Sequence, residues 1–371
     1  MKADPGLASW LKLALTPGIG PATLRRLLRQ YGLPHEVLSR PRRELEAFLS
    51  AEALSRLQSD ELEPLVERAL AWAAEPGHRV VTLADEDYPK LLLEIPDPPA
   101  LLFAAGRAEL LGRPALAVVG SRNATPQGEA NAGAFAKSLS ASGLTIVSGL
   151  ALGIDAAAHR GGLAAAGSTI AVLGTGIDVV YPQRNAALAA QIAGQGLLLS
   201  EFALGTAPAA HNFPRRNRLI SGLAQGCLVV EAALASGSLI TARSAAEQGR
   251  EVFAVPGSIH SPVSKGCHAL IKSGAKLVES AEDVLGELGG FRASGFASTV
   301  QSADVARASA EGACLLEHMG HDPVDIDALC VRAGMSAEQV SSELLRLELA
   351  GRVAVLPGGL FQRLEKGAAD G

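Results

Sequence analysis

The feature that most constrains the fold is a regular alternation of short apolar runs with longer Ala-rich segments through the middle of the chain. The continuous apolar run at 227–230 is typical of a strand that is buried on both faces. Strand–helix alternation of this length predicts an α/β fold with a doubly wound, mostly parallel sheet and right-handed crossovers. The predicted strands cover residues 115–120, 144–148, 169–174, 197–202, 227–231, 251–255 and 276–279.

Different patterns flank the sheet region and divide the 371 residues into four predicted segments. Residues 1–75 carry apolar side chains at helical spacing and predict a helical domain, after which the α/β domain takes residues 76–288. Residues 289–308 are rich in Gly, Ala and Ser without apolar periodicity, which predicts a linker. Residues 309–364 predict three helices and a hairpin, the order of a winged helix, with Ser336 as the N-cap of the third helix.

Charge is spread unevenly, and its distribution says more than the net charge of −5. Residues 113–218 hold eight Lys and Arg against four acids, whereas residues 301–371 hold six bases and eleven acids. We therefore expect a polyanion site in the middle of the chain. The third helix of the winged-helix unit carries three glutamates and one arginine, Arg346. This charge favours contact with a protein over binding in a DNA groove.

The sequence shows no pattern of a secretory signal or of a membrane span, and its four cysteines have no paired spacing. We expect a cytoplasmic protein with reduced thiols, no structural zinc and no membrane partner. Asp155 and His159 stand one helical turn apart and are interpreted as a structural cap or a hydrogen-bonded pair rather than metal ligands. Without a nucleophile–base pair, a ligand cluster or a P-loop, we expect no catalytic residues, no metal and no cofactor.

The strand ends carry residues that indicate a ligand, because ligands of doubly wound sheets bind beyond the carboxyl ends of the strands. Gly120, Ser121 and Arg122 end the first strand, just before a helix whose amides and nearby guanidinium suit an anion. A salt bridge between Arg122 and a neighbouring acid explains this turn as well. Gly149 and Gly174 end the next two strands, where glycine lets the backbone approach a ligand closely.

A cluster of arginines beside an aromatic residue follows the fourth strand. The arginines would hold phosphates, and Phe213 would stack on an unpaired base. Alternatively, Phe213 belongs to the core and the arginines are solvated at the start of a helix. The members of the cluster are Phe213, Arg215, Arg216, Asn217 and Arg218.

Two helices near the start of the chain are joined by Gly18-Ile19-Gly20. This turn looks like that of a helix-hairpin-helix, whose amides can meet a phosphate, but a tight helix connection explains it as well.

Six motifs stand in a fixed order across the α/β region. They are Gly120-Ser121-Arg122; Ser148-Gly149-Leu150-Ala151 with Asp155 and His159; Gly176-Ile177-Asp178 with Tyr181-Pro182; Ser200-Glu201; Phe213-Pro214 with Arg216-Asn217-Arg218; and Glu231-Ala232 with Ser236-Gly237-Ser238. In this order they resemble the DNA-processing protein A (DprA) family, over about residues 80–285.

The resemblance implies an extended Rossmann-like domain that binds single-stranded DNA and forms a homodimer. It also implies protection of incoming DNA and loading of the RecA recombinase during natural transformation. Carried over by position, Arg122, Phe213 and the run Arg215–Arg218 are the implied DNA contacts. Many members carry a lysine shortly before the Phe, where this chain has Ala209-Ala210, so that Arg215 and Lys265 are the candidates to replace it.

Three questions stay open on the sequence alone. The apolar strip Leu270, Ile271 and Leu277 is either a dimer interface or ordinary core. A nucleotide phosphoribohydrolase is an alternative function, because the glycine-rich turn at 236–241 together with Glu247 resembles that group. A protein-interaction adaptor that works through the acidic winged-helix unit is the other alternative.

Overall fold

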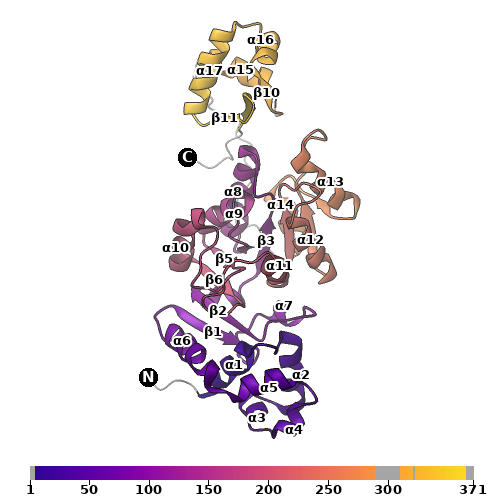
Figure 1. The fold of residues 1–371 in the computed structure, drawn as a ribbon. Coiled ribbons are helices and arrows are strands. Elements are labelled where there is room, and N and C mark those ends of the chain that lie inside the picture. Colours follow the sequence, from indigo (N-terminus) through magenta and orange to yellow (C-terminus); the bar gives the residue numbers. More distant parts are fainter. Residues whose placement is uncertain (1–4, 290–309, 321, 365–371) are drawn as a thin grey trace.

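The computed structural model describes residues 5–289, 310–320 and 322–364, and it confirms the predicted α/β fold class (Figure 1). The main sheet has nine strands in the order β1-β2-β6-β5-β4-β3-β7-β8-β9. All neighbours from β6 to β9 in this order are parallel, whereas β2 is antiparallel to both β1 and β6. The strands are β1 (His78–Thr82), β2 (Leu101–Gly106), β3 (Ala115–Val119), β4 (Thr145–Ser148), β5 (Thr169–Val172), β6 (Leu197–Ser200), β7 (Gly226–Val229), β8 (Glu251–Ala254) and β9 (Lys276–Leu277).

The strand order reverses between β3 and β7, which makes the sheet doubly wound as expected. The strands β1 and β2 lie outside the predicted set. They extend the parallel sheet by an antiparallel pair, and their sequence stands next to a Pro-rich stretch.

Helices cover both faces of the sheet, because alternate strand residues point to opposite sides. In β3, Leu116 and Val118 pack in a cluster with α8, α9 and α14, while Ala117 and Val119 pack with α11, α12 and α13. The helices of this part are α7 (Lys90–Leu93), α8 (Pro126–Ala141), α9 (Ile154–Leu163), α10 (Ala186–Gln195), α11 (Asn212–Gly222), α12 (Ser238–Glu247), α13 (Lys265–Lys272) and α14 (Ala281–Leu288).

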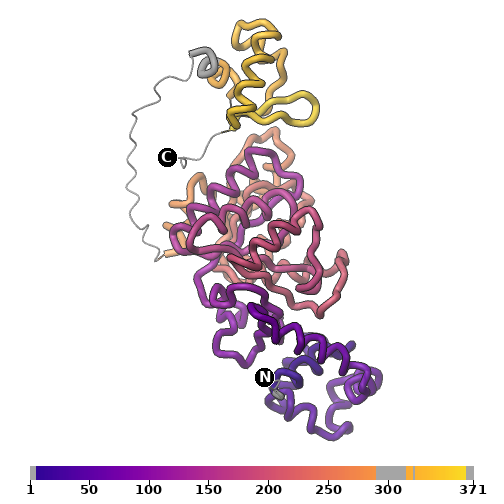
Figure 2. The backbone as a smooth tube through the Cα atoms, turned by 90° about the vertical axis from the view of Figure 1, so that its left-hand side faces the viewer, coloured from indigo at the N-terminus to yellow at the C-terminus, as the bar shows by residue number. Residues whose placement is uncertain are grey.

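The N-terminal helices pack on the antiparallel strands of the sheet. Leu11 of α1 and Val66 of α6 share a core cluster with Phe103 of β2. Figure 1 shows these helices directly beside β1 and β2, and in Figure 2 they form the indigo end of the molecule. The helices are α1 (Pro5–Leu15), α2 (Pro21–Tyr31), α3 (Pro34–Leu38), α4 (Arg42–Leu45), α5 (Ala51–Gln58) and α6 (Glu63–Ala73).

The C-terminal unit is a winged helix, as predicted. Its small sheet has the order β10-β12-β11, and Ser336 caps its third helix by accepting the Gln339 amide at 3.3 Å. The predicted linker lies outside the described residues, apart from Gly289. Among the described residues, none of the helices combines the length and the apolar character that a membrane span requires. The elements are α15 (Ala310–Met319), β10 (Val324–Asp325), α16 (Ile326–Ala333), α17 (Ala337–Leu349), β11 (Val353–Leu356) and β12 (Leu360–Arg363).

Candidate nucleic-acid interface

The carboxyl edge of the sheet brings together a cation and two aromatic rings from distant parts of the chain. Arg122, which follows β3, places its guanidinium carbon 5.6 Å from the ring centroid of Phe213 at the start of α11. Tyr181, which follows β5, places its ring 5.7 Å from that of Phe213 and is 45% exposed. We call Arg122, Phe213 and Tyr181 the cation–aromatic row.

Tyr181 was not among the predicted site residues, although it stands in one of the motifs. The signal that points to it is an aromatic residue in the loop that follows a parallel strand, which puts the ring at the same edge as the glycine-rich ends.

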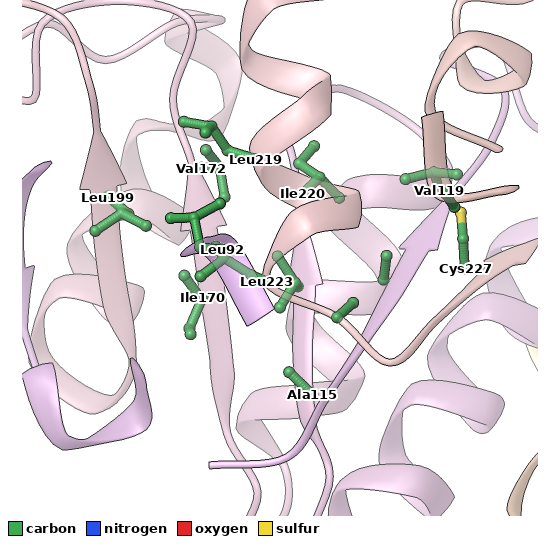
Figure 3. Packing of buried hydrophobic residues seen from close by; sticks show 14 of the residues in the cluster. Leu92, Ala115, Val119, Ile170, Val172, Leu199, Leu219, Ile220, Leu223 and Cys227 are labelled. Carbon is green, nitrogen blue, oxygen red and sulfur yellow. The ribbon is translucent and has the colours of Figure 1, made fainter. Parts of the chain in front are cut away.

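The helix α11 holds Phe213 over the end of β5. Leu219 and Ile220 of this helix and Leu223, directly after it, belong to the core cluster of the sheet, and Figure 3 shows them gathered over its strands. A Cβ built at Gly174 would lie 2.9 Å from Cδ1 of Phe213. Gly174 therefore makes room for the chain's own aromatic ring, which corrects the expectation of a close approach by a ligand. Phe213 itself is half-buried, so that one part of its ring packs inside the protein and the other part is open to solvent.

Arg216 points inward and is only 4% exposed. Its Nη1 donates a hydrogen bond of 2.7 Å to the carbonyl oxygen of Val172 at the end of β5. A Cβ built at Gly149 would lie 1.8 Å from the same nitrogen, so that Gly149 is needed to admit the guanidinium. Burial lowers the pKa of Arg216 to about 10, and nearby Asp155 opposes this shift. Arg216 and Gly149 therefore support the edge from below and are not exposed contacts.

Asp155 and His159 hold the turn that follows β4, which confirms their expected structural role. Asp155 Oδ2 accepts the amides of Gly149 at 3.0 Å and Ala151 at 3.4 Å, and His159 Nε2 accepts the amide of Leu150 at 3.2 Å. Burial raises the pKa of Asp155, which Arg216 opposes, and burial lowers the pKa of His159 to about 3. His159 is therefore neutral, as its acceptor role requires.

The crevice at the switch point between β3 and β7 is filled by a carboxylate of the chain itself. Glu231 accepts the amide of Thr125 at 2.9 Å and its hydroxyl at 2.6 Å, at the N-terminus of α8. Thr125 in turn caps α8 by accepting the amide of Gly128 at 2.9 Å, and Pro126 is the first residue of the helix. Burial raises the pKa of Glu231, and the bonds from Thr125 oppose this shift. The expectation of free amides for an anion at this helix is therefore wrong.

Arg215 and Arg218 differ sharply in their surroundings. Arg218 is bound on one side by Glu201, whose carboxylate accepts from Nη2, and on the other by the backbone carbonyl of Asp97. Arg215 is exposed, and its guanidinium carbon lies 5.3 Å from the ring centroid of Phe202. Arg215 is therefore available to a ligand, whereas Arg218 is committed to an internal ion pair.

The remaining predicted residues lie at the same edge with varied exposure. Gly120 is packed under α9, since a Cβ there would lie 2.6 Å from Cγ1 of Ile154. Ser121 and Asn217 are half-buried. Lys265 is exposed at the start of α13, and its Nζ donates to the carbonyl of Ile259.

Comparison with known proteins identifies the family. Residues 79–289 match the model of the DNA recombination-mediator protein A family, and residues 300–359 match the DprA winged helix domain. The chain belongs to the DNA recombination-mediator protein A family. It is 47% identical to protein Smf of Escherichia coli (strain K12) over 309 residues, which is 81% of both chains. It is 50% identical to the DNA processing protein DprA of Streptococcus pneumoniae over 206 residues, which is 56% of this chain and 73% of that relative.

Solved structures of DprA proteins share the fold. The X-ray structure of DprA from Streptococcus pneumoniae aligns with a TM-score of 0.65 at 39% identity, over 77% of this chain and 99% of that one. DNA processing protein A from Helicobacter pylori, whose structure is described for its single-stranded DNA binding mode, aligns with a TM-score of 0.52 at 31% identity. That alignment covers 56% of this chain and 95% of that one.

The residues of the hydrolase alternative are not brought together in this DprA-family chain. Ser236 and Ser238 bond each other through their hydroxyls at 2.7 Å at the start of α12, whereas Glu247 is the last residue of that helix. At 1.5 Å per residue the two ends of the helix are roughly 14 Å apart. Within the described ranges, no group of three or more His, Cys, Asp or Glu could hold a metal ion.

Proposed function

We propose that this chain binds single-stranded DNA along the carboxyl edge of its sheet, without changing the DNA chemically. The observation that carries the proposal is the cation–aromatic row, in which Arg122 lies 5.6 Å from the half-buried ring of Phe213. Guanidinium groups grip phosphates, and exposed rings stack on unpaired bases, which are available only in a single strand. The single-stranded DNA binding described for the Helicobacter pylori relative supports this choice of ligand.

The site residues divide into contacts and supports. Arg122 and Arg215 hold phosphates, and Phe213 and Tyr181 stack on bases. Ser121, Asn217 and Lys265 are further contacts of the same strand. The supports are Gly120, Gly149, Gly174, Arg216 and Arg218, whose packing inside the edge keeps the contacts in place.

We infer that the bound strand is protected and then passed to the RecA recombinase in the cytoplasm during natural transformation. The support is the family itself, whose model is that of a recombination mediator. A mediator must hold the strand through contacts that a recombinase can displace. Contacts to the DNA phosphates and stacking on the bases suit this task. They tolerate any base sequence, and each contributes only a modest part of the binding free energy.

We also infer a homodimer through the Rossmann-like domain. Leu277 on the edge strand β9 is 50% exposed, whereas Leu270 and Ile271 pack partly against the core. Only part of the proposed strip is therefore free for an interface. Sedimentation of the full chain should show a dimer that Leu277→Arg dissociates, and an unchanged dimer in that variant would exclude this interface.

The filled crevice argues for a binding protein rather than a nucleotide hydrolase. Doubly wound folds bind nucleotide phosphates at the helix N-terminus beside the switch point. Here the carboxylate of Glu231 takes the amide and hydroxyl of Thr125 at that place, and its charge would repel a phosphate.

An adaptor role of the winged helix is a second candidate function, favoured by the surface of α17. Leu345 is 56% exposed and Leu349 is 81% exposed, one helical turn apart on the same face. Glu338 and Glu348 are exposed on this helix as well. An acidic surface with exposed leucines suits a protein partner, because a DNA groove would repel it.

The deciding experiment is a salt titration of single-strand binding by fluorescence anisotropy. Arg122→Ala should weaken binding to every base sequence and should flatten the log–log salt slope by about 0.7, the contribution of one phosphate contact on a single strand. Arg113→Ala is the matched control, since Arg113 is also exposed but stands before β3, at the opposite edge of the sheet. Both variants should keep the wild-type melting temperature.

The result that would overturn the proposal is a folded Arg122→Ala variant with unchanged affinity and salt slope. An equal effect of Arg113→Ala would also count against the proposal. Arg122 would then act only through the overall positive charge of the protein and not through a contact at its own position.

A further inference from the structure

The N-terminal helical domain carries a row in which two arginines flank two aromatic rings. The guanidinium carbon of Arg26 lies 5.3 Å from the ring centroid of Phe48. The ring of Phe48 meets that of Tyr31 edge-on at 5.7 Å, and the guanidinium carbon of Arg40 lies 5.3 Å from the ring centroid of Tyr31. Both arginines are exposed, and both rings are half-buried. We call Arg26, Phe48, Tyr31 and Arg40 the N-terminal row.

The charges of this domain are separated along the chain. Residues 21–48 hold six arginines and three glutamates, whereas residues 49–75 hold two arginines and six acids. Two of the six arginines have acidic partners, since Arg25 pairs with Asp97 and Arg42 pairs with Glu46. The other four are exposed and form no ion pair within the described part of the chain; they are Arg26, Arg29, Arg40 and Arg43. A group of arginines without acidic partners attracts a polyanion.

The two rings decide which polyanion fits best. Guanidinium groups grip any phosphate, but aromatic rings and planar guanidinium groups also offer faces on which unpaired bases stack. A duplex keeps its bases stacked inside, and an acidic protein segment would make no use of the ring faces. The N-terminal row therefore suits a single strand of nucleic acid, as the cation–aromatic row does at the edge of the sheet.

One carboxylate holds the helix of the N-terminal row beside the helix of the proposed DNA site. Asp97 Oδ1 lies 2.7 Å from Nη1 of Arg25 on α2, and its Oδ2 lies 3.7 Å from Nε of Arg218 on α11. Arg26 directly follows Arg25 on α2, and Phe213 stands at the start of α11. A strand that leaves the carboxyl edge of the sheet is therefore close to the N-terminal row.

We propose that the N-terminal row is a second contact surface for the strand that is bound at the carboxyl edge. Arg26 and Arg40 hold phosphates of this strand, while Phe48 and Tyr31 offer ring faces to its bases. The proposal rests on the proposed single-strand binding and lengthens the bound segment. A long strand engages both surfaces, whereas a short strand engages the carboxyl edge alone.

The test compares oligo(dT) strands of two lengths by fluorescence anisotropy, on the full chain. An OB fold, a compact single-strand binder, covers roughly 4–16 nucleotides, so that strands of about 6 and about 30 nucleotides separate one contact surface from two. For the long strand, Arg26→Ala and Arg40→Ala should each weaken binding and lower the log–log salt slope by about 0.7, the contribution of one phosphate contact. The short strand should bind both variants as tightly as the wild type, whereas Arg122→Ala should weaken binding of both strands.

Arg56→Ala is the matched control for the two arginine variants. The Arg56 side chain is 41% exposed on α5 of the same domain, and it pairs with Glu52 at 2.7 Å. Its removal takes the same charge from the domain and leaves the N-terminal row intact, so that the salt slope for the long strand should stay that of the wild type. All three variants should keep the wild-type melting temperature, because substitutions of surface side chains change stability little.

A second measurement needs no variant. Phenylglyoxal modifies accessible arginines, and mass spectrometry of peptides locates the modified residues. The long strand should protect Arg26 and Arg40 and leave Arg56 reactive, whereas the short strand should protect none of the three.

Three results would overturn the second contact surface and leave single-strand binding standing. They are an unchanged affinity and salt slope for the long strand in folded Arg26→Ala and Arg40→Ala, an equal effect of Arg56→Ala, and full reactivity of Arg26 and Arg40 in the complex with the long strand. A wild type that binds neither strand would instead overturn the proposed function, and the second contact surface with it.

Discussion

The guanidinium of Arg216 occupies the space in which a side chain at Gly149 would stand, since a Cβ built there lies 1.8 Å from Nη1. Arg216 comes from α11, whereas Gly149 directly follows β4 and the acceptor Val172 ends β5. One buried side chain therefore ties a helix to the ends of two strands. The glycine that admits it is a requirement of packing, although it stands in a motif that indicates a ligand.

Gly149→Ala should therefore destabilise the fold. The added methyl group would displace the guanidinium from Val172, and overpacking of this kind costs about 1–3 kcal/mol in the free energy of unfolding. Urea unfolding measures the loss, with Gly112→Ala as the control at a glycine that has open space around it. If Gly149→Ala kept its stability and lost DNA affinity, Gly149 would be a contact after all.

The sequence predicted the parallel part of the sheet because its strands are continuous apolar runs, a pattern that depends on burial alone. It did not separate Arg215 from Arg216, because the two neighbours share composition and motif. Their positions around the axis of α11 separate them, since Arg216 lies on the same helical face as the buried Leu219, Ile220 and Leu223. A comparison of the positions of the arginines with this apolar face would have predicted that Arg216 is buried.

Other features depend on contacts across the chain that a sequence does not display. Glu231 and Thr125 are far apart in the sequence, so that nothing marks the helix N-terminus as already occupied. The N-terminal helices pack on β2, although no pattern in either segment marks the other as its partner. Patterns within one element were therefore predictable, whereas pairings between elements required the fold.

Stability should depend on pH through His159. The unfolded chain binds a proton at this residue below its ordinary pKa of about 6.5, whereas the folded chain binds none until about pH 3. The folded state is therefore fully favoured above pH 6.5 and loses up to about 1.4 kcal/mol per pH unit as the pH falls toward 3. Urea unfolding at two pH values gives the change in the free energy of unfolding per pH unit. This change should be smaller for His159→Gln than for the wild type. Equal changes in the two proteins would refute the assignment of a neutral His159.

The winged helix should be dispensable for single-strand binding. Residues 301–371 carry five more acids than bases, and the proposed DNA contacts all lie before them in the chain. A chain that ends at residue 299 should therefore bind a single strand with nearly wild-type affinity in anisotropy. A loss of more than about tenfold, roughly 1.4 kcal/mol, would show that the unit contributes to the DNA site.

A lysine at position 210 should strengthen binding. Ala210 is exposed in the loop before α11, three residues before Phe213. Ala210→Lys adds one cation beside Phe213, so that the log–log salt slope should steepen by about 0.7. Ala246→Lys is the control. It adds the same charge at an exposed position near the C-terminal end of α12 and should leave the salt slope unchanged. An unchanged slope in Ala210→Lys would mean that the strand does not pass this loop.

The stacking role of the cation–aromatic row can be separated from its electrostatic role. Tyr181→Ala removes an exposed ring, and Phe213→Ala removes the half-buried ring that Gly174 accommodates. Each should weaken single-strand binding by roughly 1–3 kcal/mol, the value of one stacked base.

Neither substitution should alter the salt slope, because stacking releases few counterions, whereas Arg122→Ala should alter it. Tyr181→Ala is the cleaner test, since its exposed ring contributes little to folding and the melting temperature should stay that of the wild type. If Phe213→Ala lost affinity only in proportion to folded protein, and Tyr181→Ala lost none, the rings would serve packing alone. The strand would then be held by its phosphates.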